Sequence, residues 1–218
     1  MNGILILLLL IITAILPLVI VFFWLKTGKS QVTLPWFLAA IASGIISLPV
    51  AALVQNLFPA PGKDGLGQIL FGVFIRIAVV EEASRFIILF PLYKAGSRQK
   101  AIDITLGAAI GLISGLGFAA VENASYGMAD INITLLRVFT AAPLHGACGI
   151  RIGAAVSIMN RQPGKAIFLF ISSVIIHGAY NLMIVSPALP SLLAVAAAFI
   201  ALFASLPLLN PPDPDPGQ

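Results

Sequence analysis

Residues 101–123 read AIDITLGAAIGLISGLGFAAVEN, an apolar run that carries a glycine at every fourth position and ends beside a carboxylate. The run is long enough to cross a membrane, because a spanning helix needs about 20 apolar residues. Gly107, Gly111 and Gly115 form a small-residue stripe, which allows a neighbouring helix to approach closely within lipid. Glu122 lies nearly two helical turns after Gly115, so it falls on the face of the stripe and should point into a helix bundle.

The rest of the chain has the same character. Of its 218 residues, 60% are hydrophobic and 9% are charged, and the mean hydropathy is +1.07. This composition excludes an ordinary soluble domain and predicts an all-α, polytopic membrane helix bundle with about seven transmembrane helices. The expected segments are 3–25, 33–58, 67–93, 101–123, 132–155, 166–186 and 189–209. They form one transmembrane domain over residues 1–209, followed by a disordered Pro-rich tail at 210–218.

The connections between these segments alternate in charge, which predicts the topology. Lys63 is balanced by Asp64 in one set of loops, which otherwise holds only Asp130. The other set is basic and contains Lys26, Lys29, Lys94, Arg98, Lys100, Arg151, Arg161 and Lys165. By the positive-inside rule the amino terminus lies outside and the carboxyl terminus in the cytoplasm. The net charge of +4 is scattered along the chain, so we expect a lipid bilayer and no nucleic acid as partner. The expected location is the plasma membrane of a prokaryote.

The three glutamates and two histidines of the chain all lie within or at the edge of apolar segments. An ionisable group within a span costs about 2.5–3.5 kcal/mol on insertion scales, and it usually faces a polar interior and serves a function. These five residues therefore predict the functional site: Glu81, Glu82, Glu122, His145 and His177.

Glu81 and Glu82 lie in the run VVEEASRFIILF, where Arg85 follows at helical spacing and can reach either carboxylate. Pairing one glutamate with Arg85 leaves the other free to act as a base. The alternative is a buried pair that only stabilises the bundle, although two adjacent glutamates are harder to explain in that way. Glu122 and Asn123 have their own alternative, a polar helix end wetted by headgroups, against which the glycine stripe argues.

The two histidines lie on later segments. In TAAPLHGACGI, which contains His145, Pro143 frees a backbone carbonyl one turn earlier, and Gly146 and Gly149 open space for another group to approach. His177 has Asn181 one turn later on the same face, where an amide could bind a developing oxyanion. Measured from the segment midpoints, Glu122 comes out about 13 Å nearer the outer face than the level of His145. Its helix must therefore be shifted or tilted if the groups are to meet.

Four short motifs occur in order on successive segments: Glu81-Glu82-x-x-Arg85, Phe118-x-x-x-Glu122-Asn123, His145-x-x-x-Gly149 and His177-x-x-x-Asn181. Together they resemble the PrsW family of intramembrane proteases, within the wider group that includes the CAAX prenyl endopeptidases and the APH-1 subunit of gamma-secretase. The resemblance implies an endopeptidase with its catalytic core at 67–186, which hydrolyses membrane-embedded or membrane-anchored proteins through water activated by glutamate and histidine.

The resemblance also implies residue roles. Glu81 or Glu82 would be the general base, helped by His145, and His177 with Asn181 would stabilise the oxyanion. Glu122 would also be catalytic and would orient or share the water. Supporting roles fall to Arg85, which would hold the glutamate pair, and to Phe118 and Asn123. The spacing leaves open which glutamate is the base.

Two rival hypotheses remain. The first is a zinc protease with ligands drawn from His145, His177, Glu82 and Glu122, although the HExxH pattern is absent. We favour the metal-free interpretation, with no cofactor, on the family resemblance. The second is a protein without enzymatic activity, either an APH-1-like scaffold or a proton-coupled transporter. The chain lacks the internal repeats typical of transporters. Its oligomeric state stays open.

Overall fold

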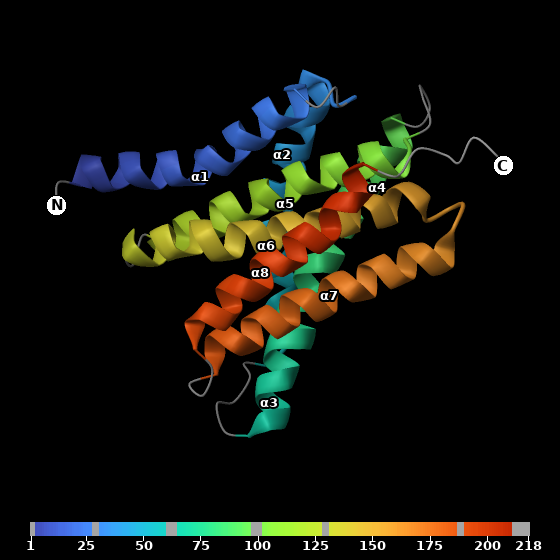
Figure 1. Cartoon of the computed structure of the whole chain (residues 1–218). Coiled ribbons are helices and arrows are strands. Elements are labelled where there is room, and N and C mark those ends of the chain that lie inside the picture. Colours follow the sequence, from blue (N-terminus) through green and yellow to red (C-terminus); the bar gives the residue numbers. More distant parts are fainter. Residues whose placement is uncertain are drawn as a thin grey trace.

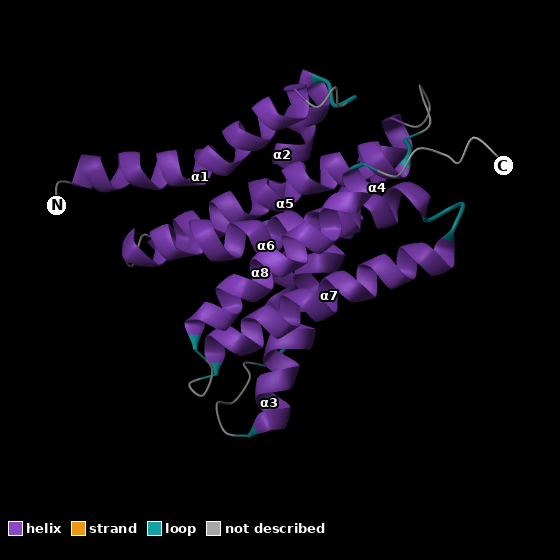
Figure 2. Cartoon of the chain, in the orientation of Figure 1, coloured by secondary structure: helices purple, strands orange, loops and turns teal. Residues whose placement is uncertain are grey.

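The structure, a computed structural model, describes residues 3–27, 31–59, 65–96, 102–127, 131–186 and 190–210. Within these ranges every regular element is helical, as Figure 2 shows, so the all-α prediction is confirmed. The elements are α1 (Gly3–Thr27), α2 (Leu34–Gln55), α3 (Leu66–Leu70), the π-helix η1 (Phe71–Val79), α4 (Val80–Gly96), α5 (Ile104–Gly127), α6 (Ile131–Ile158), α7 (Pro163–Val185), α8 (Ser191–Ser205) and the 3-10 helix η2 (Leu206–Leu209).

Five stretches are long and apolar enough to cross a membrane, and they lie in α2, α5, α6, α7 and the run from α8 into η2. The number of seven spanning helices and the side of each terminus stay predictions. Residues 211–218 of the predicted tail lie outside the described residues, as do several of the charged loop positions used for the topology: Lys29, Lys63, Asp64, Arg98, Lys100 and Asp130.

Helices α5 and α6 lie side by side at the centre of the bundle (Figure 1). Their glycines bring the two backbones into contact. A Cβ atom placed on Gly111 would collide with the carbonyl oxygen of Gly149, and one on Gly115 with that of His145. The predicted glycine stripe is therefore the contact face of α5, because only a residue without a side chain allows this approach.

The other helices surround this pair. Figure 1 shows α1 on one side of α5 and α6, with α7 and α8 on the other. Helix α2 packs closely on α5, because a Cβ atom on Gly44 would collide with the Ser114 carbonyl oxygen. The Ser43 hydroxyl also donates to Ser114 Oγ at 2.9 Å. The polar residues of these interfaces thus bond one another within the bundle.

The stretch from Leu66 to Gly96 is helical throughout but changes its winding from α3 through η1 to α4, and it crosses α7 steeply in Figure 1. A π-helix of nine residues is unusual, because such windings are rare and frequently occur at functional sites. The Phe74 ring of η1 packs against Gly178 on α7, where a Cβ atom would overlap it. Arg76 Nε donates to the Gln55 carbonyl oxygen at 3.2 Å. Phe74 and Arg76 both lie on the helical stretch shortly before Glu81, so these two contacts hold the backbone that leads to the glutamates.

Candidate active site

Glu82 is fully buried, and both of its carboxylate oxygens have partners. Oε1 pairs with the Arg85 guanidinium and lies 2.7 Å from His177 Nδ1. Oε2 accepts a hydrogen bond from Ser173 Oγ at 3.0 Å. Arg85 and Ser173 both donate to this carboxylate, and these are the surroundings of an ionised group, so Glu82 also accepts from His177 and we assign the His177 proton to Nδ1. Glu82 thus fixes the orientation of His177, which directs its other nitrogen elsewhere.

Glu81 is also buried, at 6% exposure, but one of its oxygens is free of hydrogen bonds. Oε1 accepts from Gln55 Nε2 at 3.2 Å. Oε2 has no hydrogen-bond partner among the described residues and lies 3.7 Å from His177 Nε2. With the proton on Nδ1, Nε2 presents a lone pair to a carboxylate oxygen. Two acceptors that face each other need a proton on one of them, or a proton donor or a cation between them.

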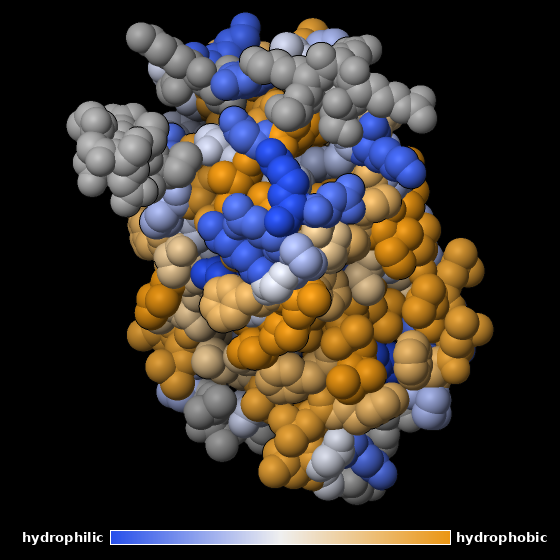
Figure 3. Space-filling model, turned by 90° about the vertical axis from the view of Figure 1, so that its right-hand side faces the viewer, coloured by the Kyte–Doolittle hydropathy of each residue, from blue (hydrophilic) through white to orange (hydrophobic). Residues whose placement is uncertain are grey.

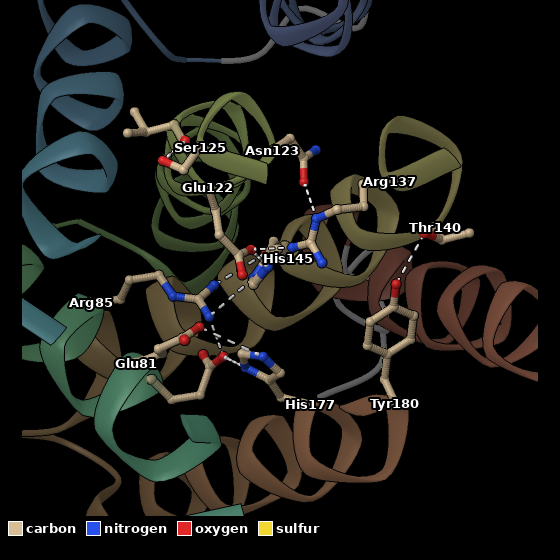
Figure 4. A network of polar contacts seen from close by, with 12 residues as sticks. Glu81, Arg85, Glu122, Asn123, Ser125, Arg137, Thr140, His145, His177 and Tyr180 are labelled. Carbon is tan, nitrogen blue, oxygen red and sulfur yellow. Dashed lines mark hydrogen bonds and ion pairs between the residues drawn. The ribbon is translucent and has the colours of Figure 1, made fainter. Parts of the chain in front are cut away.

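Glu122 and His145 form the opposite side of the cluster (Figure 4). His145 Nε2 lies 2.8 Å from Glu122 Oε2, and the same oxygen pairs with Arg137 Nη2 at 2.6 Å. Since the ion pair with Arg137 keeps this carboxylate an acceptor, Nε2 is the donor. His145 Nδ1 then accepts, and the Arg85 Nη2 atom lies 3.5 Å from it. Arg85 therefore connects the Glu82 side of the cluster to the His145 side.

The depth difference expected for Glu122 is bridged without a large helix shift. The α5–α6 register, with Gly115 against His145, puts Glu122 level with Val138, about 10 Å along the axis from His145. Side chains on a helix lean toward its amino terminus. Because the two helices are antiparallel, Glu122 and His145 lean toward each other and meet. Helix α5 also continues to Gly127, so Glu122 does not lie at a helix end.

The supporting residues take defined places. The Phe118 ring lies between two members of the cluster, with its centroid 4.8 Å from Arg85 Cζ and 5.1 Å from the His145 ring. Asn123 Oδ1 accepts a hydrogen bond from Arg137 Nε at 2.9 Å. Asn181 is half-buried one turn after His177, and within the described ranges no hydrogen bond joins it to the cluster. Its oxyanion role stays a prediction.

Four residues of the site were not foreseen from the sequence: Gln55, Arg76, Arg137 and Ser173. Arg137 gave a usable signal, since a guanidinium within the apolar segment 132–155 is as costly as the five residues singled out. It contacts Glu122 and Asn123, and its guanidinium lies 4.2 Å from the Tyr126 ring centre. Gln55 and Ser173 gave none, because a neutral polar residue near a helix end or within a span is common.

A metal site can be tested against this geometry. The ligand atoms of Glu81, His145 and His177 all lie within 4.8 Å of one another, and two histidines with one carboxylate are a known catalytic zinc set. Glu81 Oε2 and His177 Nε2 are available as they stand. Both nitrogens of His145 are engaged, by Glu122 and by Arg85, so it could serve only if one of these contacts were released. Glu82, which the zinc hypothesis named as a ligand, instead accepts a hydrogen bond from His177 Nδ1 and so orients this histidine.

The order of these groups along the chain agrees with a known family. A family model described as PrsW family intramembrane metalloprotease matches residues 32–206, from just before α2 into η2. This chain belongs to the PrsW family. Neither the curated proteins nor the solved structures that were compared with it gave a match.

The PrsW match confirms the family resemblance seen in the motifs and includes every residue of the cluster. The protein is therefore an integral membrane protein of an intramembrane protease family, and membership of this family implies substrates that are membrane proteins in a bilayer. The prokaryotic plasma membrane stays a prediction.

Proposed function

We propose that this protein is an endopeptidase in which Glu81 is the general base that activates water for hydrolysis of a peptide bond within or beside the membrane. The observation that supports the proposal most directly is the facing pair of acceptors, Glu81 Oε2 and His177 Nε2, at 3.7 Å. A water molecule can donate one hydrogen to each of them, which leaves its lone pairs directed toward a carbonyl carbon.

In the proposed reaction Glu81 takes a proton from the water as its oxygen attacks the scissile carbonyl carbon. The carbonyl π electrons move to oxygen, and the Asn181 amide donates to the resulting oxyanion, while His177 Nε2 accepts the hydrogen bond of the O–H that the attacking water keeps. Glu81 then passes its proton to the amide nitrogen, and the C–N bond breaks to give a carboxylic acid and an amine. No covalent intermediate with the protein forms.

The two neighbouring glutamates therefore have unequal roles. Glu82 is saturated by Arg85, His177 and Ser173, so it positions His177 and has no oxygen left for water. Glu122 acts on the other histidine in the same manner, because it keeps the proton of His145 on Nε2. His145 then completes the polar wall opposite Glu81.

A second candidate is metal-dependent hydrolysis, favoured by the convergence of Glu81, His145 and His177 and by the description of the matched family. These three residues would hold a zinc ion. The chemistry that zinc supplies in such a site is Lewis-acid polarisation of the scissile carbonyl. In this candidate His145 must give up its contact with Glu122 or with Arg85.

The experiment is cleavage of a library of transmembrane peptides by the purified protein in detergent. We expect Glu81→Gln to lower the rate by about 10²- to 10⁴-fold, the usual worth of a general base, with little change in unfolding. The matched variant Glu82→Gln should lower both activity and stability, because it weakens the partner of buried Arg85. Full cleavage by Glu81→Gln would disprove the proposal, and cleavage of no peptide by the wild type would favour a scaffold or transporter.

Metal dependence is decided separately on the same preparation. Full activity under strong chelation, with no metal found by elemental analysis, removes the zinc candidate. Loss of activity that added zinc restores would replace the metal-free mechanism by the zinc mechanism.

A further inference from the structure

A cavity with a volume of about 260 Å³ lies at one end of the bundle, between the last turns of α4 and α6 and the start of α5. Its floor includes the apolar side chains of Phe90, Ile102 and Val156, and its rim includes Lys94, Asn160 and Arg161. Lys94 follows Glu82 by twelve residues on α4, about 18 Å along the helix. The cavity is therefore separate from the catalytic cluster.

The rim of this cavity is positively charged. Lys94 and Arg161 line it, and none of the lining residues is acidic. Arg161 Nη2 donates to the backbone oxygens of Ile102 at 3.0 Å and Ser157 at 3.2 Å. Carbonyl oxygens fix the direction of the guanidinium but carry no full negative charge, and within the described ranges no ion pair joins Arg161 to a carboxylate. Asp103, which follows the lining residue Ile102, does not itself line the cavity; its Oδ1 accepts from the Leu106 amide at 2.7 Å and caps α5. The cavity thus attracts an anion.

Apolar surface lies beside the basic end of the molecule that holds the cavity. Figure 3 shows the end of the molecule where the α6–α7 connection lies in Figure 1, and hydrophilic residues gather there among hydrophobic ones. On α7, directly after this connection, Ile167 and Phe168 are 51% and 66% exposed. A helix surface of this kind faces lipid tails. A ligand at this site therefore meets cations on one side and hydrocarbon on the other.

We propose that this cavity binds the phosphate-bearing headgroup of an anionic phospholipid, with Arg161 and Lys94 on the phosphate and the apolar floor against the first carbons of the lipid. Basic residues at the end of a helix bundle bind such headgroups by charge. A soluble phosphate would use the rim but would gain nothing from Phe90 and Ile102. The inference does not depend on the proposed hydrolysis.

The test is native mass spectrometry of the full chain in detergent, with phosphatidylglycerol or phosphatidylcholine added at equal concentration. We expect retention of phosphatidylglycerol to exceed that of phosphatidylcholine. Lys94→Gln and Arg161→Gln should each weaken phosphatidylglycerol binding about fivefold, the effect of one basic residue near an anionic headgroup. The matched control is Lys165→Gln, which removes an exposed charge at the start of α7 that does not line the cavity, and it should change binding less than twofold.

Equal retention of the two lipids would overturn the proposal. Equal losses of phosphatidylglycerol binding in all three variants would also overturn it, because they would indicate a diffuse surface charge. The proposal would also be overturned if inorganic phosphate displaced the lipid at a concentration equal to that at which the lipid itself binds. The apolar floor would then contribute nothing to binding. Lys94→Gln keeps the test decisive if Arg161→Gln fails to fold, since Arg161 also bonds two backbone carbonyls.

Discussion

Arg85 is the residue whose replacement tests the architecture of the cluster most directly. It is fully buried together with Glu82, its ion-pair partner. It also donates to the His145 carbonyl oxygen at 3.4 Å and lies over the Phe118 ring. We predict that Arg85→Ala destabilises the protein far more than Arg85→Lys, because only alanine leaves a buried carboxylate without a cation.

The sizes follow from these contacts. Breaking a buried pair by removing one partner costs about 3–5 kcal/mol of unfolding free energy, which is the expected loss for Arg85→Ala. Lysine keeps the charge near Glu82 but loses the fork that reaches the His145 carbonyl and the stacking on Phe118, about 1–2 kcal/mol. The double variant Arg85→Met with Glu82→Gln removes both charges, and it should be more stable than Arg85→Ala alone.

The assay is chemical unfolding in detergent micelles, followed by tryptophan fluorescence, with peptide cleavage measured on the same samples. Equal unfolding free energies for Arg85→Ala and Arg85→Lys would show that the charge is not buried with Glu82. A double variant less stable than Arg85→Ala would refute the same reasoning, because the unpaired carboxylate could not then be the source of the loss.

Two further predictions concern residues outside the motifs. Gly111→Ala should lower the unfolding free energy by about 1–3 kcal/mol, since its Cβ would meet the α6 backbone. Gly164 has open space around it, so Gly164→Ala should change the unfolding free energy by less than about 0.5 kcal/mol. Similar losses in both variants would exclude close packing as the cause. If Glu81 is the base, Gln55→Ala should lower kcat about 10- to 100-fold with KM unchanged, because it removes the hydrogen bond to Glu81. The exposed neighbour Asn56 gives the control, since a loss of cleavage in Asn56→Ala as large as in Gln55→Ala would contradict this role.

The sequence was sufficient for the helices and for one interface. Long apolar runs predict spanning helices without any knowledge of their partners, because lipid leaves the backbone no other way to satisfy its hydrogen bonds. The stripe of Gly107, Gly111 and Gly115 predicted close approach by a neighbouring helix for a similarly local reason. The structure adds that Gly149 and Gly153 of α6 face this stripe, so both helices have glycines at the contact.

The division of work between the two glutamates could not be predicted. Glu81 and Glu82 are adjacent, and each is within reach of Arg85 on an ideal helix. Their difference comes from Ser173 and Gln55, which lie on α7 and α2 and become neighbours only when the bundle is assembled. The depth of Glu122 was overestimated because the predicted segment 101–123 ends too early, whereas α5 runs from Ile104 to Gly127, and because segment midpoints ignore the direction in which side chains lean.

The π-helix η1 has a consequence for how this family member can tolerate change. Its nine residues fix Phe74 on α7 and Arg76 on α2, while the α4 helix that follows carries the glutamates. An α-helix rotates by about 100° for each residue, whereas the i→i+5 bonding of a π-helix places more residues in each turn. A segment wound in this way can lose one residue by tightening toward an α-helix, which keeps Glu81 and Glu82 directed at the histidines. In this segment the winding of the backbone therefore sets the direction of the glutamates together with the number of residues.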